Sequence, residues 1–473
     1  MGRLNIIIAG FVGSALATGA FAQDIITKKY DDGSVYEGTF VNGLQDGTGT
    51  YRLPNGYEYS GDWVAGVISG KGKARFPNGS VYEGQFVSGK PEGQGTITFA
   101  NGGSYAGDWT GGEMTGNGKV TYANGVVYEG AVRAGQHHGK GILVDPDGNR
   151  YEGGWVDGKM QGKGKFTYSD GSTYDGDFVA GERSGQGTLI LPDGLTYVGN
   201  WKDGQTNGTG KLTQPNGDSY QGPFVDGQRS GDGKISFANG DVYVGAFKAD
   251  QRSGKGIFTA KDGTVYDGDW FGGKMQGIGK MSYPNGDVYE GGFADDQQDG
   301  KGKITYADGS TYDGDWKHGA ITGNGKAVYA NGASYDGALL NALPEGKGVM
   351  LYADGFRYEG DWKAGKREGS GLATWADGTS YSGGFKNGLR EGKGKLVQPD
   401  GFSYDGDWLA GEMTGQGVAL YPGGDRYEGG FVAGKRDGTG VLTYSNGKTA
   451  GGTWTKGILT APAPATEPVP PAN

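Results

Sequence analysis

The sequence has no cysteine and only three histidines among its 473 residues, His137, His138 and His318. The absence of cysteine excludes disulfides, thiol nucleophiles, thiolate-bound metal clusters and an acylated cysteine anchor. The formal net charge of −10 argues against nucleic acid as a partner, because nucleic-acid binding needs a basic surface. Beyond the N-terminal segment, no stretch has the apolar period of an amphipathic helix.

Hydrophobic residues are also scarce, at 34%, which is too few for the roughly three conventional domains that the length would suggest. Glycine is instead abundant: 103 residues, roughly 22% against a background of about 7%. Aromatic residues make up 12%, too many for a disordered glycine-rich linker. Glycine for turns together with aromatics for stacking indicates a repetitive β structure.

The first residues predict a secretory signal peptide over Met1–Ala22. Arg3 precedes a short apolar run, and residues 20–22 form an A-x-A site, so we expect cleavage before Gln23. The alternative is an uncleaved membrane anchor, although the apolar run is short for a span of roughly 20 residues. We therefore expect an exported protein, periplasmic or secreted, and the sequence does not decide between the two.

The rest of the chain divides into three predicted parts. Residues 23–35 are a lead-in or cap, 36–457 are a repeat array, and 458–473 are a proline-rich disordered tail.

The array is defined by a tyrosine that recurs every 23 residues, from Tyr36 to Tyr427, without insertion or deletion. Ala450 takes the nineteenth place. If the tyrosine is counted as position 0, most of the glycines fall at +2, +7, +11, +13 and +20. A period of this length indicates a stacked array of small supersecondary units.

Each unit is predicted to be a β-hairpin. The segment from the tyrosine to an aromatic residue at +4 alternates as a strand does, and Gly at +7 permits a turn before a returning strand. Asn-Gly or Asp-Gly at +19/+20, as in Asn78-Gly79 and Asp354-Gly355, is a strong turn signal because both residues tolerate positive φ. The fold class is therefore all-β: an elongated, single, twisted antiparallel sheet of about 19 hairpins.

Residue parity assigns the two faces of this sheet. Positions 0, +4, +15 and +17 share an aromatic face, whereas acids at +1 and +3 and lysines at +12 and +14 share a solvated face. Cross-strand charge pairs on that second face are expected to be structural, at about 0.2–1 kcal/mol each. Gly at +2 is expected to leave a slot in which a ring from the adjacent hairpin lies flat on the backbone.

The pattern Y-[ED]-G-x-[FW]-x-x-G-x-x-x-G-x-G appears from Tyr82 as YEGQFVSGKPEGQG and from Tyr358 as YEGDWKAGKREGSG. It resembles the MORN repeat (membrane occupation and recognition nexus) over about Tyr36–Gly457. The resemblance implies hairpins in one twisted sheet, a groove lined by aromatic side chains, and a role as a binding or assembly module. Relatives of this kind also carry kinase or methyltransferase domains, but nothing outside the array here is large enough for one.

Tryptophan at +4 recurs mainly at every second hairpin, which suggests either a binding groove or a packing alternation; the sequence leaves both open. The candidate groove residues are Tyr59, Trp63, Tyr105, Trp109, Tyr151, Trp155, Tyr266, Trp270, Tyr312, Trp316, Tyr358, Trp362, Tyr404 and Trp408.

No catalytic motif is found, and no cofactor or metal is expected. The pair His137-His138 falls in a predicted turn and is interpreted as a solvated loop. The sequence therefore predicts a non-enzymatic, extracytoplasmic binding or scaffold protein whose groove holds a protein, a peptide or another copy. The alternatives are attachment to a phospholipid surface, which the negative charge opposes, and glycan binding at the cell envelope.

Overall fold

The computed structural model describes residues 24–463, so the predicted signal peptide and most of the predicted tail lie outside the described residues. The described part contains 40 β-strands and no helix. It divides into two compact units, up to Ala238 and from Asn239 onward. The predicted all-β class is confirmed. No helix in the described range is long and apolar enough to cross a membrane.

In the first unit the strands are β1 (Ile26–Lys29), β2 (Val35–Val41), β3 (Leu44–Arg52), β4 (Glu58–Val64), β5 (Val67–Arg75), β6 (Val81–Val87), β7 (Lys90–Thr98), β8 (Ser104–Thr110), β9 (Glu113–Thr121), β10 (Val127–Arg133), β11 (Gln136–Val144), β12 (Arg150–Val156), β13 (Lys159–Thr167), β14 (Thr173–Val179), β15 (Glu182–Ile190), β16 (Thr196–Lys202), β17 (Gln205–Thr213), β18 (Ser219–Val225), β19 (Gln228–Arg229) and β20 (Gly231–Ser236).

In the second unit they are β21 (Val242–Lys248), β22 (Gln251–Thr259), β23 (Val265–Phe271), β24 (Lys274–Ser282), β25 (Val288–Ala294), β26 (Gln297–Thr305), β27 (Thr311–Lys317), β28 (Ala320–Val328), β29 (Ser334–Leu340), β30 (Leu343–Leu351), β31 (Arg357–Lys363), β32 (Lys366–Thr374), β33 (Ser380–Lys386), β34 (Leu389–Val397), β35 (Ser403–Leu409), β36 (Glu412–Leu420), β37 (Arg426–Val432), β38 (Lys435–Thr443), β39 (Thr449–Thr455) and β40 (Ile458–Pro462).

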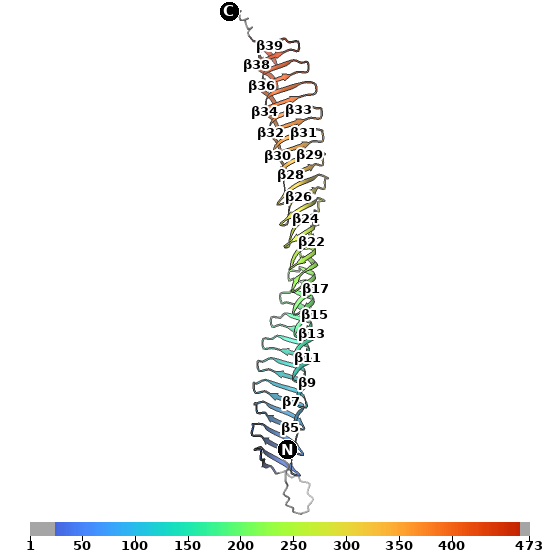
Figure 1. The fold of residues 1–473 in the computed structure, drawn as a ribbon, viewed down its shortest axis with the longest axis vertical. Helices are drawn as coiled ribbons and strands as arrows, with labels where there is room; N and C mark the ends of the chain where they lie inside the picture. The colour runs from blue at the N-terminus through green and yellow to red at the C-terminus, as the bar shows by residue number, and fades with distance from the viewer. Residues whose placement is uncertain (1–23, 464–473) are drawn as a thin grey trace, which may run out of the picture. The chain divides into compact units, whose positions relative to one another are not determined.

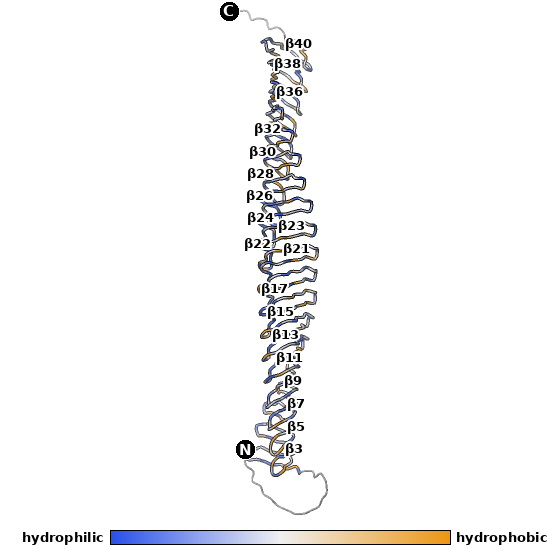
Figure 2. The backbone as a smooth tube through the Cα atoms, turned by 90° about the vertical axis from the view of Figure 1, so that its right-hand side faces the viewer, coloured by the Kyte–Doolittle hydropathy of each residue, from blue (hydrophilic) through white to orange (hydrophobic). Residues whose placement is uncertain are grey.

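Within each unit the strands pair antiparallel in chain order, as Figure 1 shows strand by strand. Most 23-residue repeats supply a seven-residue strand followed by a nine-residue strand, as in β27 and β28. The return strand that follows β18 is split into β19 and β20, and the last one, β40, has five residues. The register shifts between Gly314 and Trp316, and the same irregularity follows the +2 glycine in most repeats. Along the backbone, hydrophobic and hydrophilic residues alternate, as strands with two different faces require (Figure 2).

Two kinds of turn connect the strands. At the hairpin tip both central residues have positive φ, as at Asn387 (49°) and Gly388 (86°), the geometry that matches the twist of an antiparallel pair. At the other end, Gly309 N–H donates to Tyr306 O and Tyr306 N–H donates to Ser310 O. There only the glycine takes positive φ, as at Gly309 (83°) and Gly355 (85°). The predicted turns at Asn-Gly and Asp-Gly are therefore present, but only their second residue uses the positive φ that both tolerate.

The two sheet ends carry shorter elements. β1 pairs with β2 and places the Tyr30 hydroxyl 3.0 Å from the Gln45 side-chain amide, which donates to it. At the other end, β40 pairs with β39 around a turn at Lys456-Gly457. The first five residues of the predicted tail therefore belong to the sheet. The last repeat keeps its tip turn even though Ala450 replaces the tyrosine.

Candidate functional site: an aromatic face

The tyrosine at position 0 lies inside its own hairpin. The Tyr404 ring lies against Gly417, where an added Cβ would come within 2.5 Å of Tyr404 Cε2. Its hydroxyl donates to Asp407 O at 3.0 Å. The other repeats share this arrangement, so glycine is required at +13 because the ring occupies the space of a side chain. The slot was expected at the +2 glycine, and an added Cβ at Gly406 would also come within 2.5 Å of the Tyr404 hydroxyl. The slot therefore holds the ring of the same hairpin and not a ring from the adjacent one.

The aromatic residue at +4 then covers the tyrosine of the preceding hairpin. Trp316 packs edge-on against Tyr289 at 5.0 Å and against Tyr312 at 5.7 Å between ring centroids. Its Nε1–H donates to Gly302 O at 3.0 Å. Phe293 makes the same edge-on contacts with Tyr266 and Tyr289 without a hydrogen bond. The rings therefore form a packed row, worth about 0.5–1.5 kcal/mol per aromatic pair beyond burial. The row is interrupted once in each unit, where Val132 and Leu339 replace the aromatic residue at +4.

All fourteen candidate groove residues belong to this packed row. The seven tyrosines are at most 2% exposed and the seven tryptophans 3–7% exposed. They line the aromatic face from within and leave little surface of their own for a partner. Their role in binding stays a prediction.

The rings that reach the surface of this face are those at +17. The sequence places them on the aromatic face, but they are not among the predicted groove residues. Tyr283, Tyr306 and Tyr329 are half-buried, and Tyr352 is 36% exposed. The +17 residue is the last one before the connecting turn, so no further strand residue packs over it. That position next to Asn-Gly or Asp-Gly is the signal that could have identified these rings.

Arginines at +9 are a second feature that sequence reasoning missed. The Arg390 guanidinium lies 4.0 Å from the Trp408 ring centroid, and Nη2–H donates to Gly411 O at 2.8 Å. Arg183 and Arg436 repeat both contacts with the tryptophan and glycine of the following hairpin. These cations stack on the rings, which is favourable by about 0.5–2 kcal/mol per contact.

His137 occupies the same +9 position and is only 7% exposed, so its interpretation as part of a solvated loop is wrong. Its ring stacks on Tyr128 at 3.7 Å, and Nε2 lies 2.8 Å from the Tyr122 hydroxyl. Burial lowers the pKa of His137 to about 4. His138 lies in the same strand, with Nδ1 3.6 Å from an Asp157 carboxylate oxygen. Across residues 24–463 there is no cluster of His, Cys, Asp or Glu suited to a metal ion.

The low pKa of His137 predicts a pH-dependent stability of the first unit. Above about pH 6.5 the residue is neutral in both states. Below it the unfolded state takes up a proton and the folded state does not, so stability falls as pH drops toward 4, by about 1.4 kcal/mol per pKa unit of difference. Urea unfolding of the native chain and of His137→Gln at pH 7 and pH 4.5 measures this. The variant should lose less stability on acidification; equal losses would contradict the assignment.

The opposite face carries the predicted ladder of charges. Lys301 Nζ lies 2.6 Å from Asp315 Oδ1, and Asp315 Oδ2 also accepts the Asn324 N–H at 2.8 Å. Lys347–Asp361 and Lys393–Asp407 repeat the ion pair. The hydrogen bond from Lys301 is the main cause that lowers the pKa of Asp315. These carboxylates accept a backbone N–H of the return strand at the point where the register shifts after the +2 glycine. Their role is therefore structural.

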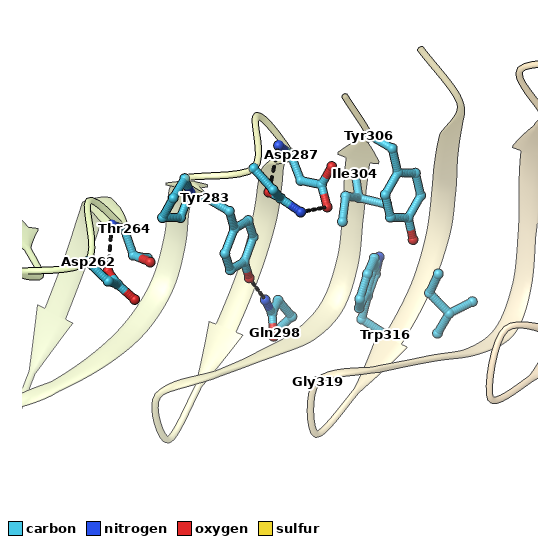
Figure 3. Close-up of a pocket in the computed structure, with 12 residues that line it drawn as sticks. Asp262, Thr264, Tyr283, Asp287, Gln298, Ile304, Tyr306, Trp316 and Gly319 are labelled. Carbon is cyan, nitrogen blue, oxygen red and sulfur yellow. Dashed lines mark hydrogen bonds between the residues drawn. The ribbon is translucent and has the colours of Figure 1, made fainter. Parts of the chain in front are cut away.

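One cavity of about 600 Å³ opens on the aromatic face of the second unit. Tyr283, Gln298, Tyr306 and Trp316 line it together with Asp262 and seven other residues (Figure 3). Gln298 occupies +9, the position at which arginine covers the tryptophan in other repeats. Its amide donates to the Tyr283 hydroxyl at 2.6 Å. Loss of that arginine leaves the hollow beside Trp316.

Comparison with known families agrees with this architecture. A profile of the MORN repeat matches eighteen consecutive segments, from residues 36–56 to 427–449. The chain belongs to the MORN repeat family. The matched MORN repeats end at 449, so the hairpin that begins at Ala450 lies outside them.

Similarity outside the MORN profile is local. Alsin of Rattus norvegicus is 45% identical over 56 residues, and human Alsin is 41% identical over 56; each match covers 11% of this MORN chain and 3% of Alsin. The TCP10 domain of Danio rerio CPAP is similar to 52% of this chain over 99% of that domain, with 17% identity and a TM-score of 0.20. Values this low carry no argument about function.

Proposed function

We propose that this MORN array is a non-enzymatic binding or scaffold protein that acts outside the cytoplasm and holds a protein or peptide on its aromatic face. The observation that carries the proposal is the row of half-buried +17 rings, with Tyr306 and Tyr329 at its centre. Within each unit, no second sheet or helix of the described residues covers this face. Protein interfaces are enriched in aromatic side chains at their centres, because these bury large area at low cost in conformational entropy.

The export part of the proposal is supported by the signal-peptide pattern of Met1–Ala22. A variant in which a single initiator methionine replaces residues 1–22 should no longer be recovered from the cell envelope or the medium. Recovery there without these residues would contradict it.

The binding part is tested with two double variants in the same two hairpins. Tyr306→Ser with Tyr329→Ser removes rings from the aromatic face, whereas Lys303→Ser with Lys326→Ser changes the opposite face. We expect partners captured from an envelope fraction by the native chain to be lost from the first variant and kept by the second. Circular dichroism confirms that both are folded. Equal capture by the two variants would contradict a binding role for this face.

A glycan is the second candidate, because half-exposed rings in a row also suit stacking on sugars. Sedimentation with purified peptidoglycan, using the same pair of variants, tests it. Loss of sedimentation only in the tyrosine variant would favour the glycan. Failure of the native chain to sediment would remove it.

A further inference from the structure

Five consecutive repeats of the second unit carry an aromatic residue at +17. We call these residues the ring ladder: Tyr283, Tyr306, Tyr329, Tyr352 and Trp375. Two of them, Tyr283 and Tyr306, line the cavity beside Trp316 (Figure 3). At the far end, Trp375 packs against Phe356 at 5.1 Å. The ladder is interrupted on both sides, by Ala260 before it and Gln398 after it.

The spacing of the ladder selects the conformation of a bound chain. Successive rings are separated by two strands, or about 9.6 Å. A polyproline II helix repeats every three residues, or about 9.3 Å, so four of its turns span about 37 Å against about 38 Å for the ladder. An α-helix repeats its face every seven residues, about 10.5 Å, and would drift by roughly 4 Å over the same length. An extended strand repeats its face every about 6.6 Å, which does not match.

The middle of the ladder also offers free hydrogen-bond donors. Burial raises the pKa of Tyr306 and of Tyr329, so both hydroxyls stay protonated at neutral pH. Ile321 and Pro344 stand where Gln298 binds the Tyr283 hydroxyl, and within residues 24–463 neither Tyr306 nor Tyr329 has a hydrogen-bond partner for its hydroxyl. Polyproline II backbone carbonyls are unpaired and accept such donors.

The edge of the ladder is acidic. Asp262 and Asp287 line the cavity at its first ring. The turns that follow later rings add further exposed aspartates, Asp308, Asp354 and Asp377.

Three cations lie near this edge, fewer than its five aspartates. Arg357 is paired with Glu359 at 2.7 Å, and Arg367 lies over the Phe356 ring at 5.3 Å. Lys261 is next to Asp262 in the turn before the ladder. The edge therefore complements a cationic partner. The chain's own proline-rich end, Ala461–Asn473, has Glu467 and neither Lys nor Arg, so its charge does not fit.

From the match of spacing, donors and charge we infer that the ring ladder binds a basic, proline-rich peptide in the polyproline II conformation. The inference rests on the proposed binding role of the aromatic face and names its occupant. Prolines stack on successive rings, the hydroxyls of Tyr306 and Tyr329 donate to peptide carbonyls, and lysine or arginine side chains reach the aspartates of the edge. This is recognition by aromatic-lined grooves, in which a preformed helix loses little entropy on binding.

The test uses three labelled peptides with the purified full chain. (Pro-Pro-Lys)4 has the conformation and the charge, (Pro-Pro-Glu)4 has the conformation only, and (Gly-Ser-Lys)4 has the charge only. Fluorescence anisotropy should show binding of the first, with affinities for the other two at least about tenfold weaker. The inference is overturned if either (Gly-Ser-Lys)4 or (Pro-Pro-Glu)4 binds as tightly as (Pro-Pro-Lys)4.

The two double variants locate the bound peptide. Tyr306→Ser with Tyr329→Ser should weaken (Pro-Pro-Lys)4 by about tenfold or more, while Lys303→Ser with Lys326→Ser stays within about twofold of the native chain. Unchanged affinity in the tyrosine variant overturns the inference. If none of the peptides binds but envelope partners or peptidoglycan are still lost from the tyrosine variant alone, the inference fails and the aromatic face keeps a different ligand. If those are not lost either, the proposed function fails as well.

Discussion

Replacing Gly417 by alanine should destabilise the hairpin β35–β36 by about 3 kcal/mol. The new Cβ would lie 2.5 Å from Cε2 and from the hydroxyl oxygen of Tyr404. Tyr404 is 0% exposed, and its ring also packs against Trp408 and Phe431. Overpacking of a filled core costs about 1–3 kcal/mol. The ring has no second position on this face, so the upper end of that range applies.

The matched control is Gly423→Ala, six residues further along. No atom lies within 4 Å of the Cβ at Gly423, and its φ is in the ordinary range, so that substitution should leave stability unchanged within about 0.5 kcal/mol. Because a repeat array opens locally, amide hydrogen exchange of β35 and β36 is the measurement, read against β23 and β24 in the same molecule. Similar loss of protection in both variants would mean that the +13 glycine serves chain flexibility and not ring packing.

The period of the sequence predicts the hairpins and their faces because every 23-residue unit repeats the same physical problem. Tyr404 and Trp408 lie on the same face because they are an even number of residues apart in one strand. Position 417 needs a residue without a side chain if a ring is to pack against its backbone. Sequence alone could not tell which ring fills the slot. That depends on side-chain direction, and Tyr404 turns back along its own strand to reach Asp407 O.

The candidate site was harder to predict for the same reason. Regular tyrosine and tryptophan columns draw attention, yet regularity here marks burial, as at Tyr404 with no exposed surface. The less regular +17 column holds the accessible rings, including Tyr352. Arg390 is a further example. From the sequence, a charged residue at +9 is expected to be exposed to solvent, whereas the structure places its guanidinium on the Trp408 ring.

The tryptophan column gives the second large effect, expected from Trp408→Ala at about 4 kcal/mol. Trp408 is 3% exposed and contacts Tyr381 at 5.2 Å and Tyr404 at 5.3 Å. Its removal leaves a cavity shared by two hairpins, and Trp→Ala substitutions in cores cost about 3–5 kcal/mol. Hydrogen exchange should therefore speed up in both β33–β34 and β35–β36.

Trp408→Phe separates ring packing from the hydrogen bond. Phenylalanine fills +4 in the neighbouring repeats and meets both tyrosines there. This variant should therefore lose the bond from Nε1–H to Gly394 O, about 1 kcal/mol, and part of the stacking with Arg390, which lies 4.0 Å from the Trp408 ring. If the phenylalanine variant lost as much as the alanine variant, the hydrogen bond, and not ring packing, would join the hairpins. If alanine lost less than about 1 kcal/mol, neighbouring hairpins would be independent. The expected order, alanine far below phenylalanine, makes each repeat's stability depend on the ring that the next repeat supplies.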